Sequence, residues 1–310
     1  MKPASSPSPR GETNVELDTI RPRVSALGIL FTMVSIVCFT VMDAMIKWMG
    51  STYPVQELVF FRCAAALFLV TLIVWNQGGL KGLATAKPGL HLMRSLLGLT
   101  AMGCAFYGYT VMPLGEAASI FHTAPLLATA FSVPILREKV GVHRWSCIII
   151  GLIGVLIIIR PGGGVFSQGA VFMFSAAVLV ALTTNIIRKL NTHSSAICIT
   201  FYFTLSGTIV SLIACLIMGW IPPKSTDWIW LIGIGLLGGL GQYTMTLSLR
   251  FGEVGLIAPF RYVSIVLATL IGFFVWSEVP DLISFMGMSI IILSGLYAVY
   301  RETRVRVIRY

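Results

Sequence analysis

The stretch AASIFHTAPLLATAFSVPILREKVGVHR, residues 117–144, is an apolar run interrupted by one histidine and two prolines and followed by a basic segment. A second stretch, LIAPFRYVSIVLATLIGFFVWSEVPD at 256–281, aligns with it when Glu138 is placed on Glu278. The polar interruption of the first copy, His122, then has a polar counterpart at the same place in the second. A chain built twice from one such unit is typical of a membrane transporter with two-fold symmetry.

The composition is that of a membrane protein. The 310 residues are 56% hydrophobic and only 11% charged, and the mean hydropathy is +0.89, whereas a soluble domain carries about 25% charged residues. These values exclude an ordinary soluble enzyme. The net charge of +10 does not indicate nucleic-acid binding, because the basic residues lie between apolar runs instead of on one face.

Apolar runs long enough to span a bilayer recur along the whole chain. A spanning helix needs about 20 mostly apolar residues, and short connections between such runs make sequence neighbours antiparallel. The sequence therefore predicts an all-α membrane protein with ten transmembrane helices. The ten runs are residues 26–48, 55–75, 91–112, 117–136, 144–160, 169–189, 196–219, 228–249, 255–277 and 282–300.

The basic residues predict the orientation. Seventeen of the 22 lysines and arginines, Arg94 among them, fall on one side of the predicted membrane, and three fall on the other. Two more, Arg62 and Arg261, lie within spans. Because cytoplasmic segments carry the excess of Lys and Arg, we expect both termini in the cytoplasm.

The two halves of the chain repeat each other. Asp43 and Lys47 at the end of the first span match Asn185 and Lys189 at the end of the sixth. The repeated unit therefore has five helices, and since five is odd, the second copy enters the membrane inverted. The expected organisation is a disordered cytoplasmic tail at 1–24, a first repeat at 25–160, a second repeat at 168–300 and a basic cytoplasmic tail at 301–310.

Ionisable residues inside a membrane are costly, so each needs a partner or a function. Asp43 and Lys47 are spaced i, i+4 and are predicted either to pair or to handle substrate or protons. Arg62 is predicted to pair with Glu57 or with Asp43 across helices, or to contact a ligand. These three residues form the predicted set for charge pairing or coupling.

A second set of polar and aromatic residues is predicted to line a cavity. Arg261 shares a small, polar face with Ser264, although pairing with Glu253 is the alternative. His122 either titrates or hydrogen-bonds a neighbouring helix, and we expect it in the outer half, with Arg261 in the inner half. Pro125 and Pro134 are expected to bend their helix. The whole set is Arg261, His122, Tyr262, Gln242, Tyr107, Ser264 and Thr129.

Motifs for chemistry are absent from the sequence. There is no GxxxxGK[ST] phosphate loop, no HExxH, no GxSxG nucleophile elbow and no acidic pair in metal spacing. We therefore expect no enzyme activity, no cofactor and no metal site. Secondary transport is the main hypothesis; a channel, a membrane enzyme and an assembly scaffold are the alternatives.

The repeats carry a resemblance to a known family. Ten spans, inverted five-helix units, Pro125 thirteen residues before Glu138, Arg62 early in the second span and the glycine pattern beginning at Gly151 resemble the drug/metabolite transporter superfamily, in its EamA branch. The second repeat departs from the family by carrying Ile265 at a common proline position. The resemblance implies alternating access around a central cavity lined by both repeats, in a bacterial inner membrane.

The resemblance extends to a substrate class. The segments 39–48 and 53–62 are similar to those of bacterial importers of riboflavin and of S-adenosylmethionine. Both substrates carry a planar ring, with which the aromatic residues are compatible. Arg261 as the deep charge favours a neutral or anionic small molecule such as riboflavin. Import of S-adenosylmethionine, export of amino acids or other metabolites, and a homodimer remain open.

Overall fold

A computed structural model describes residues 13–76, 83, 85, 87–137, 140–160, 168–191, 193–251 and 257–307. Within these ranges the regular secondary structure is entirely helical. The elements are α1 (Thr13–Met49), α2 (Val55–Asn76), α3 (Pro88–Val111), α4 (Leu114–Phe121), α5 (Ala124–Leu136), α6 (Val142–Ile159), α7 (Gln168–Leu190), α8 (Ala196–Met218), α9 (Trp228–Phe251), η2 (Ala258–Tyr262), α11 (Val263–Trp276) and α12 (Leu282–Val307).

The predicted fourth span is broken near its middle. Helix α4 ends at Phe121, and α5 begins at Ala124 with a proline in its first turn. A proline is tolerated there because its missing N–H has no helical partner to lose. The expected bend at Pro125 is thus confirmed, whereas Pro134 lies inside α5 without ending it.

The predicted ninth span is broken at the matching place. The 3₁₀ turn η2 passes into α11 at Tyr262 and Val263. Pro259 lies in the first turn of η2, so Ile265 does not prevent the break. Both broken spans also end alike: Arg137 and Ser277 adopt left-handed φ values of 58° and 56° as the C-caps of α5 and α11. The same local geometry in both halves supports the repeat.

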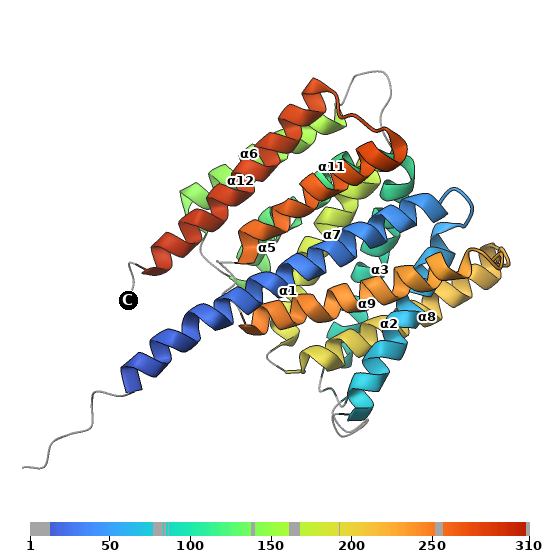
Figure 1. Ribbon diagram of the computed structural model, residues 1–310, viewed down its shortest axis with the longest axis horizontal. Helices are drawn as coiled ribbons and strands as arrows, with labels where there is room; N and C mark the ends of the chain where they lie inside the picture. The colour runs from blue at the N-terminus through green and yellow to red at the C-terminus, as the bar shows by residue number, and fades with distance from the viewer. Residues whose placement is uncertain are drawn as a thin grey trace, which may run out of the picture.

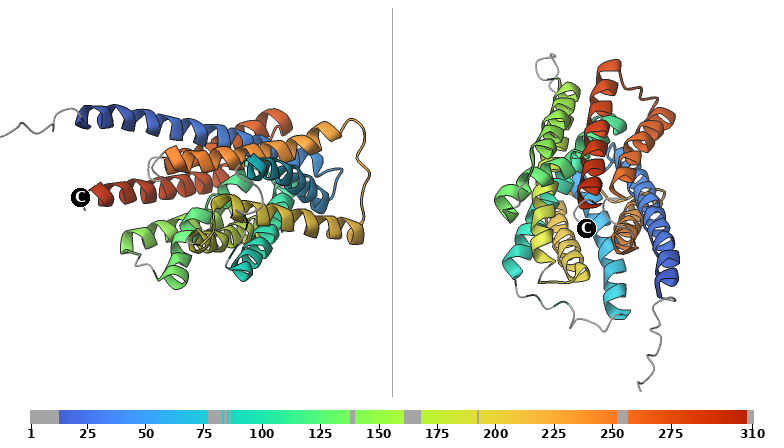
Figure 2. Two further views of the ribbon diagram at one scale, coloured as in Figure 1. Left: turned by 90° about the horizontal axis from the view of Figure 1, so that it is seen from below. Right: turned by 90° about the vertical axis from the view of Figure 1, so that its left-hand side faces the viewer.

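The helices of the two halves interlock. Helix α1 of the first half packs on α9 of the second, and α3 of the first half packs on α7 of the second. These two contacts are equivalent, because α1 corresponds to α7 and α3 corresponds to α9. Helix α2 also packs on its counterpart α8, and α6 packs on its counterpart α12. Figure 1 shows α6 beside α12 at one edge and α1 running along α9. In Figures 1 and 2, α1 begins and α12 ends at the same end of the bundle, called here the terminal end. The opposite end, where α11 ends, is called the Glu278 end.

The helices have membrane lengths and apolar surfaces. In the described part of the chain, eight helical segments are long and apolar enough to cross a bilayer. Helices α3 and α9, each 24 residues long, fall outside that set, so ten spans remain a prediction. Large apolar side chains such as Phe68, Leu216 and Phe274 are exposed, as expected for a surface that faces lipid.

The first and last helices are longer than the sequence predicts. Helix α1 begins at Thr13, inside the segment expected to be a disordered tail, and α12 continues to Val307, past the predicted end at residue 300. Extending an existing helix adds one hydrogen bond per residue without a new nucleation step, which accounts for both extensions. Residues 1–12 and 308–310 lie outside the described ranges.

Candidate functional site

The two helix breaks meet inside the bundle. His122 caps the end of α4, and its Nδ1 lies 2.8 Å from the carbonyl oxygen of Ala118. Its Nε2 lies 2.8 Å from the hydroxyl of Ser264 in the first turn of α11, and its ring centroid is 6.1 Å from that of Tyr262. In a neutral imidazole with its proton on Nδ1, Nε2 can only accept, so the single Ser264 hydroxyl proton goes either to Nε2 or to the carbonyl oxygen of Arg261, 2.7 Å away. We call His122, Arg261, Tyr262 and Ser264 the crossing.

The members of the crossing differ in exposure. Tyr262 is only 6% exposed, and it packs so closely on α12 that a Cβ on Gly295 would lie 1.8 Å from its hydroxyl oxygen. Arg261, the preceding residue, is exposed, although η2 is packed among α1, α11 and α12. Tyr262 therefore belongs to the core, and Arg261 is the charged residue that is exposed at the crossing.

One sequence prediction about the crossing is wrong. His122 and Arg261 were expected in opposite halves of the membrane, facing opposite entrances. The hydroxyl of Ser264 instead contacts both His122 and the carbonyl oxygen of Arg261, at 2.8 and 2.7 Å. The two residues therefore lie at one depth, because each sits at the break of its span and the breaks of inverted repeats meet inside the bundle.

A partly buried ion pair joins four elements at the Glu278 end. Lys47 Nζ lies 2.5 Å from Glu278 Oε1, with side chains 9% and 20% exposed. Lys47 also donates to the carbonyl oxygen of Met112 at 2.6 Å. The second oxygen of Glu278 accepts from the amide of Leu114 at 2.9 Å, and the Trp276 ring lies 5.4 Å from the lysine nitrogen. The ends of α1, α3 and α11 and the start of α4 are thereby held together.

The predicted pair between Asp43 and Lys47 is therefore wrong. Lys47 bonds to Glu278, whose backbone amide is fixed by a hydrogen bond to the Gly272 carbonyl in the left-handed cap of α11. Asp43 instead interacts electrostatically with Arg62 and lies near the Tyr109 hydroxyl, without forming an ion pair with Arg62. Arg62 is 7% exposed.

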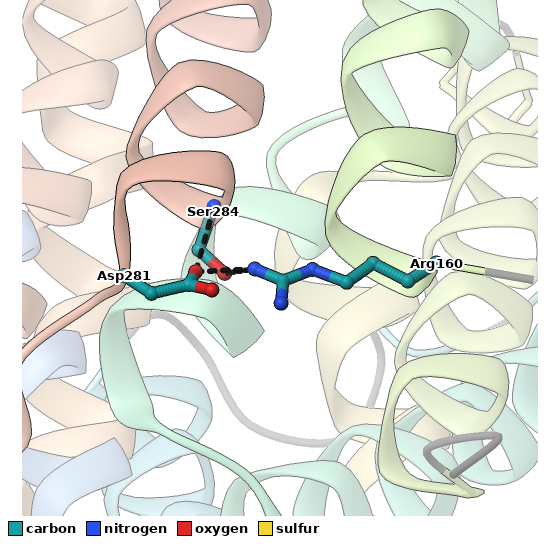
Figure 3. A network of polar contacts seen from close by, with 3 residues as sticks. All are labelled: Arg160, Asp281 and Ser284. Carbon is teal, nitrogen blue, oxygen red and sulfur yellow. Dashed lines mark hydrogen bonds and ion pairs between the residues drawn. The ribbon is translucent and has the colours of Figure 1, made fainter. Parts of the chain in front are cut away.

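A second ion pair lies at the same end, on the surface (Figure 3). Arg160, the C-cap of α6, contacts Asp281 just before α12 and lies 3.2 Å from the Ser284 hydroxyl. The amide of Ser284 donates to the same Asp281 oxygen at 2.9 Å. The hydrogen bonds from Arg160 and then from Ser284 hold the pKa of Asp281 below its usual value. The side chains of Arg160 and Asp281 are 38% and 52% exposed.

The remaining predicted cavity residues lie away from the crossing. The Tyr107 hydroxyl bonds to Gln168 at the start of α7, 3.3 Å away. Thr129 donates to the Pro125 carbonyl of its own helix, and Gln242 is exposed on α9. The alternative partner of Arg261, Glu253, lies outside the described residues, as does Glu138.

Sequence reasoning missed Arg94. It was counted with the cytoplasmic segment, but its guanidinium stacks on Phe203, 3.7 Å from the ring centroid. The glycine one turn further along α3, Gly98, leaves room for it: a Cβ there would lie 2.6 Å from Arg94 Nη1. An arginine followed four residues later by glycine is the signal that was available.

Inverted repeats, two broken helices that meet inside the bundle and an exposed charge at that point define a polytopic membrane transporter fold. The EamA-like transporter family matches the chain twice, over residues 26–160 and 167–300. The chain therefore belongs to the EamA-like transporter family, within the drug/metabolite transporter superfamily.

Several relatives match over most of their length. An S-adenosylmethionine uptake transporter of Rickettsia prowazekii (strain Madrid E) is 27% identical, covering 89% of this chain and 94% of its own. A pseudopaline exporter of Pseudomonas aeruginosa (strain UCBPP-PA14) is 29% identical, over 86% and 94%. A riboflavin transporter of Vibrio cholerae serotype O1 is 26% identical, over 89% and 94%.

A solved crystal structure has the same fold. It is 18% identical to this chain and superposes with a TM-score of 0.65, covering 91% of this chain and 99% of its own. At this identity the likeness concerns the fold alone.

Proposed function

We propose that this protein is a secondary transporter that moves a small organic metabolite across a bacterial inner membrane by alternating access. The observation that carries the proposal is the crossing, where the broken spans of both repeats meet around His122 and Ser264 with Arg261 exposed beside them. Breaks in spanning helices leave backbone groups that only a cavity or protein contact can satisfy. In transporters with inverted repeats such breaks mark the substrate site.

Alternating access requires a contact that closes one end and can be broken. Lys47 and Glu278 supply such a contact in this proposal, because their pair links the first repeat to the second at the ends of their helices. The predicted excess of Lys and Arg near the terminal end supports placing that end in the cytoplasm. The Glu278 end then faces the opposite compartment.

The substrate is a small polar metabolite. The preference for riboflavin rested on Arg261 as the deep charge, but Asp43 interacts electrostatically with Arg62 inside the bundle, so both signs of charge are present there. Relatives are named for S-adenosylmethionine uptake, pseudopaline export and riboflavin transport. We retain S-adenosylmethionine and riboflavin as the two candidates to test first.

Uptake by proteoliposomes tests the function. Purified protein is reconstituted, and entry of labelled S-adenosylmethionine and riboflavin is compared for the unaltered chain, Arg261→Ala and the surface control Arg160→Gln. We expect Arg261→Ala to abolish uptake of the transported compound and Arg160→Gln to retain it. Full uptake by Arg261→Ala would remove this residue from the site, and uptake of neither compound would reject both candidates.

The driving force is tested in the same vesicles. A protonophore is added with and without an imposed pH gradient, and His122→Asn is compared with the unaltered chain. If His122 couples transport to protons, the protonophore abolishes accumulation of substrate by the unaltered chain, and it has no effect on uptake by His122→Asn. An uptake rate that changes with neither the pH gradient nor the protonophore would exclude proton coupling.

A further inference from the structure

Arg94 is a partly buried cation with incomplete hydrogen bonding. Its Nε and Nη1 atoms are covered by protein, and neither has a hydrogen-bond partner. Lysine and arginine near a helix end usually extend toward the nearest interface. Arg94 extends the other way, since its Nη1 occupies the space beside Gly98, one turn further along α3 from the terminal end.

The surroundings of Arg94 are positive. Arg62 interacts with it electrostatically, and the nearest titratable group of potentially opposite sign is the thiol of Cys63. No described carboxylate lies within ion-pair distance of Arg94. Asp43 interacts electrostatically with Arg62, whereas Arg94 has no carboxylic acid among the groups that act on it. An uncompensated charge in a dry interior is unfavourable, and in membrane proteins such residues mark sites of function.

The geometry of Arg94 suits a planar anion. Phe203 covers one face of the guanidinium at 3.7 Å, and stacking of this kind leaves the edge of the group for hydrogen bonds. The edge of a guanidinium presents parallel N–H donors that match the two oxygens of a carboxylate. The unpaired Nε atom is a donor of the edge that it shares with Nη2, and the unpaired Nη1 atom is a donor of the other edge that contains Nη2.

We propose that Arg94, with Arg62 beside it, binds a carboxylate group of the transported metabolite between α2, α3 and α8. This inference rests on the proposed transport function and narrows its substrate class. Asp43, which interacts with both Arg62 and Tyr109, is the nearby acceptor for an ammonium group of the same molecule. The subsite therefore selects metabolites that contain an amino acid over neutral ones, which favours S-adenosylmethionine over riboflavin.

Binding to the purified, full-length protein in lipid nanodiscs tests the subsite without requiring transport. The probes are S-adenosylmethionine, its decarboxylated analogue, riboflavin and acetate, measured by calorimetry and by the shift in melting temperature. Arg94→Gln removes the charge, Arg94→Lys keeps it without the planar edge, and Arg160→Gln is the exposed control. We expect S-adenosylmethionine to bind at least about tenfold more weakly to Arg94→Gln than to the unaltered chain, as for loss of a charged hydrogen bond. The affinity of Arg94→Lys should lie between those two values.

The small anion makes the test independent of substrate identity. Acetate is expected to raise the melting temperature of the unaltered chain and of Arg160→Gln, but not that of Arg94→Gln. The decarboxylated analogue should bind equally weakly to the unaltered chain and to Arg94→Gln. Equal stabilisation of Arg94→Gln and the unaltered chain by acetate would overturn the proposal, as would tight binding of the decarboxylated analogue. Binding as expected without uptake in vesicles would reject the transport function and leave the subsite standing.

Discussion

Two ion pairs lie at the same end of the molecule, with acids three residues apart, and they differ in depth. Glu278 meets Lys47 with side chains 20% and 9% exposed, and backbone groups of Met112 and Leu114 complete the contact. Asp281 meets Arg160 in solvent, with exposed fractions of 52% and 38%. Because exposed pairs contribute about 0–1 kcal/mol and loss of one partner from a buried pair costs about 3–5 kcal/mol, only the first pair is expected to control closure.

The helices that each pair joins sharpen the contrast. Arg160 and Asp281 connect α6 and α12, which pack along their length without needing the pair (Figure 1). Lys47 and Glu278 connect α1 and α11, which share a smaller contact. A charge pair matters most where little else holds two helices together, and such a place can also open.

The largest effect is expected for Glu278→Gln and Lys47→Met. Each leaves one charge without its partner in a mostly covered site, so each should lower the free energy of unfolding by about 2–3 kcal/mol, below the fully buried case because Glu278 keeps some solvent contact. Uptake should fall with it. Thermal unfolding in nanodiscs and uptake by proteoliposomes measure the two effects, and an unchanged melting temperature for both variants would contradict the account.

The double variant, Lys47→Met with Glu278→Gln, measures the coupling between the two residues. Removing both charges leaves neither unpaired, so the two losses should fall short of additivity by about 1–3 kcal/mol. The matched cycle on Arg160→Gln and Asp281→Asn should give a much smaller coupling. Equal coupling in the two cycles would mean that depth does not separate the pairs.

A smaller effect is expected from Gly272→Ala. A Cβ at this position would lie 2.9 Å from Glu278 Oε2, the oxygen that accepts from Leu114, so the carboxylate must shift from its present contacts, at a cost of about 1 kcal/mol. The control is Gly103→Ala in α3, where a Cβ would have nothing within 4 Å and alanine is favoured in a helix by about 1 kcal/mol. Melting temperatures should therefore move in opposite directions. A rise in the melting temperature of both variants would show that the Glu278 carboxylate can move without loss of stability.

The smallest effect is expected from Asp281→Asn. The pKa of Asp281 is lowered by Arg160 and then by Ser284, so its contribution is present above the unfolded pKa of about 3.9 and is lost as pH falls through the lower folded value. At pH 7 the Asp281→Asn variant should transport normally. Its loss of stability should be smaller than that of Glu278→Gln. Unfolding curves from pH 7 to pH 3 check this. Loss of transport in Asp281→Asn would contradict the assignment of closure to Lys47 and Glu278 alone.

The sequence was informative wherever the signal was local or repeated. The repeat and the break at Pro125 follow from alignment and proline chemistry, and the family follows from the resemblance of the motifs. The second break was not predicted, because Ile265 stands at the common proline position and the break instead begins at Pro259. His122, Ser264 and Arg261 were all selected as polar interruptions of apolar runs. Their meeting at one depth required the packing of both repeats, because neither span alone determines where its break lies in the bundle.

Partners that are distant in the chain were not predictable. Lys47 has an acid four residues away in its own helix, and only the three-dimensional arrangement shows that Glu278 takes its place. Arg94 lies near a predicted span boundary, where counting basic residues assigns it to a loop. Its direction depends on the space beside Gly98 and on the ring of Phe203 from another helix.

The most direct measurement of the central claim is solvent access to the crossing from the Glu278 end. Arg261→Cys, in a chain whose six native cysteines are replaced, is labelled in vesicles by a thiol reagent that cannot cross membranes, applied from that side. Adding Glu278→Gln should increase the labelling rate, whereas adding Asp281→Asn should leave it unchanged. Equal labelling rates in all three proteins would contradict closure of the transport path by Lys47 and Glu278.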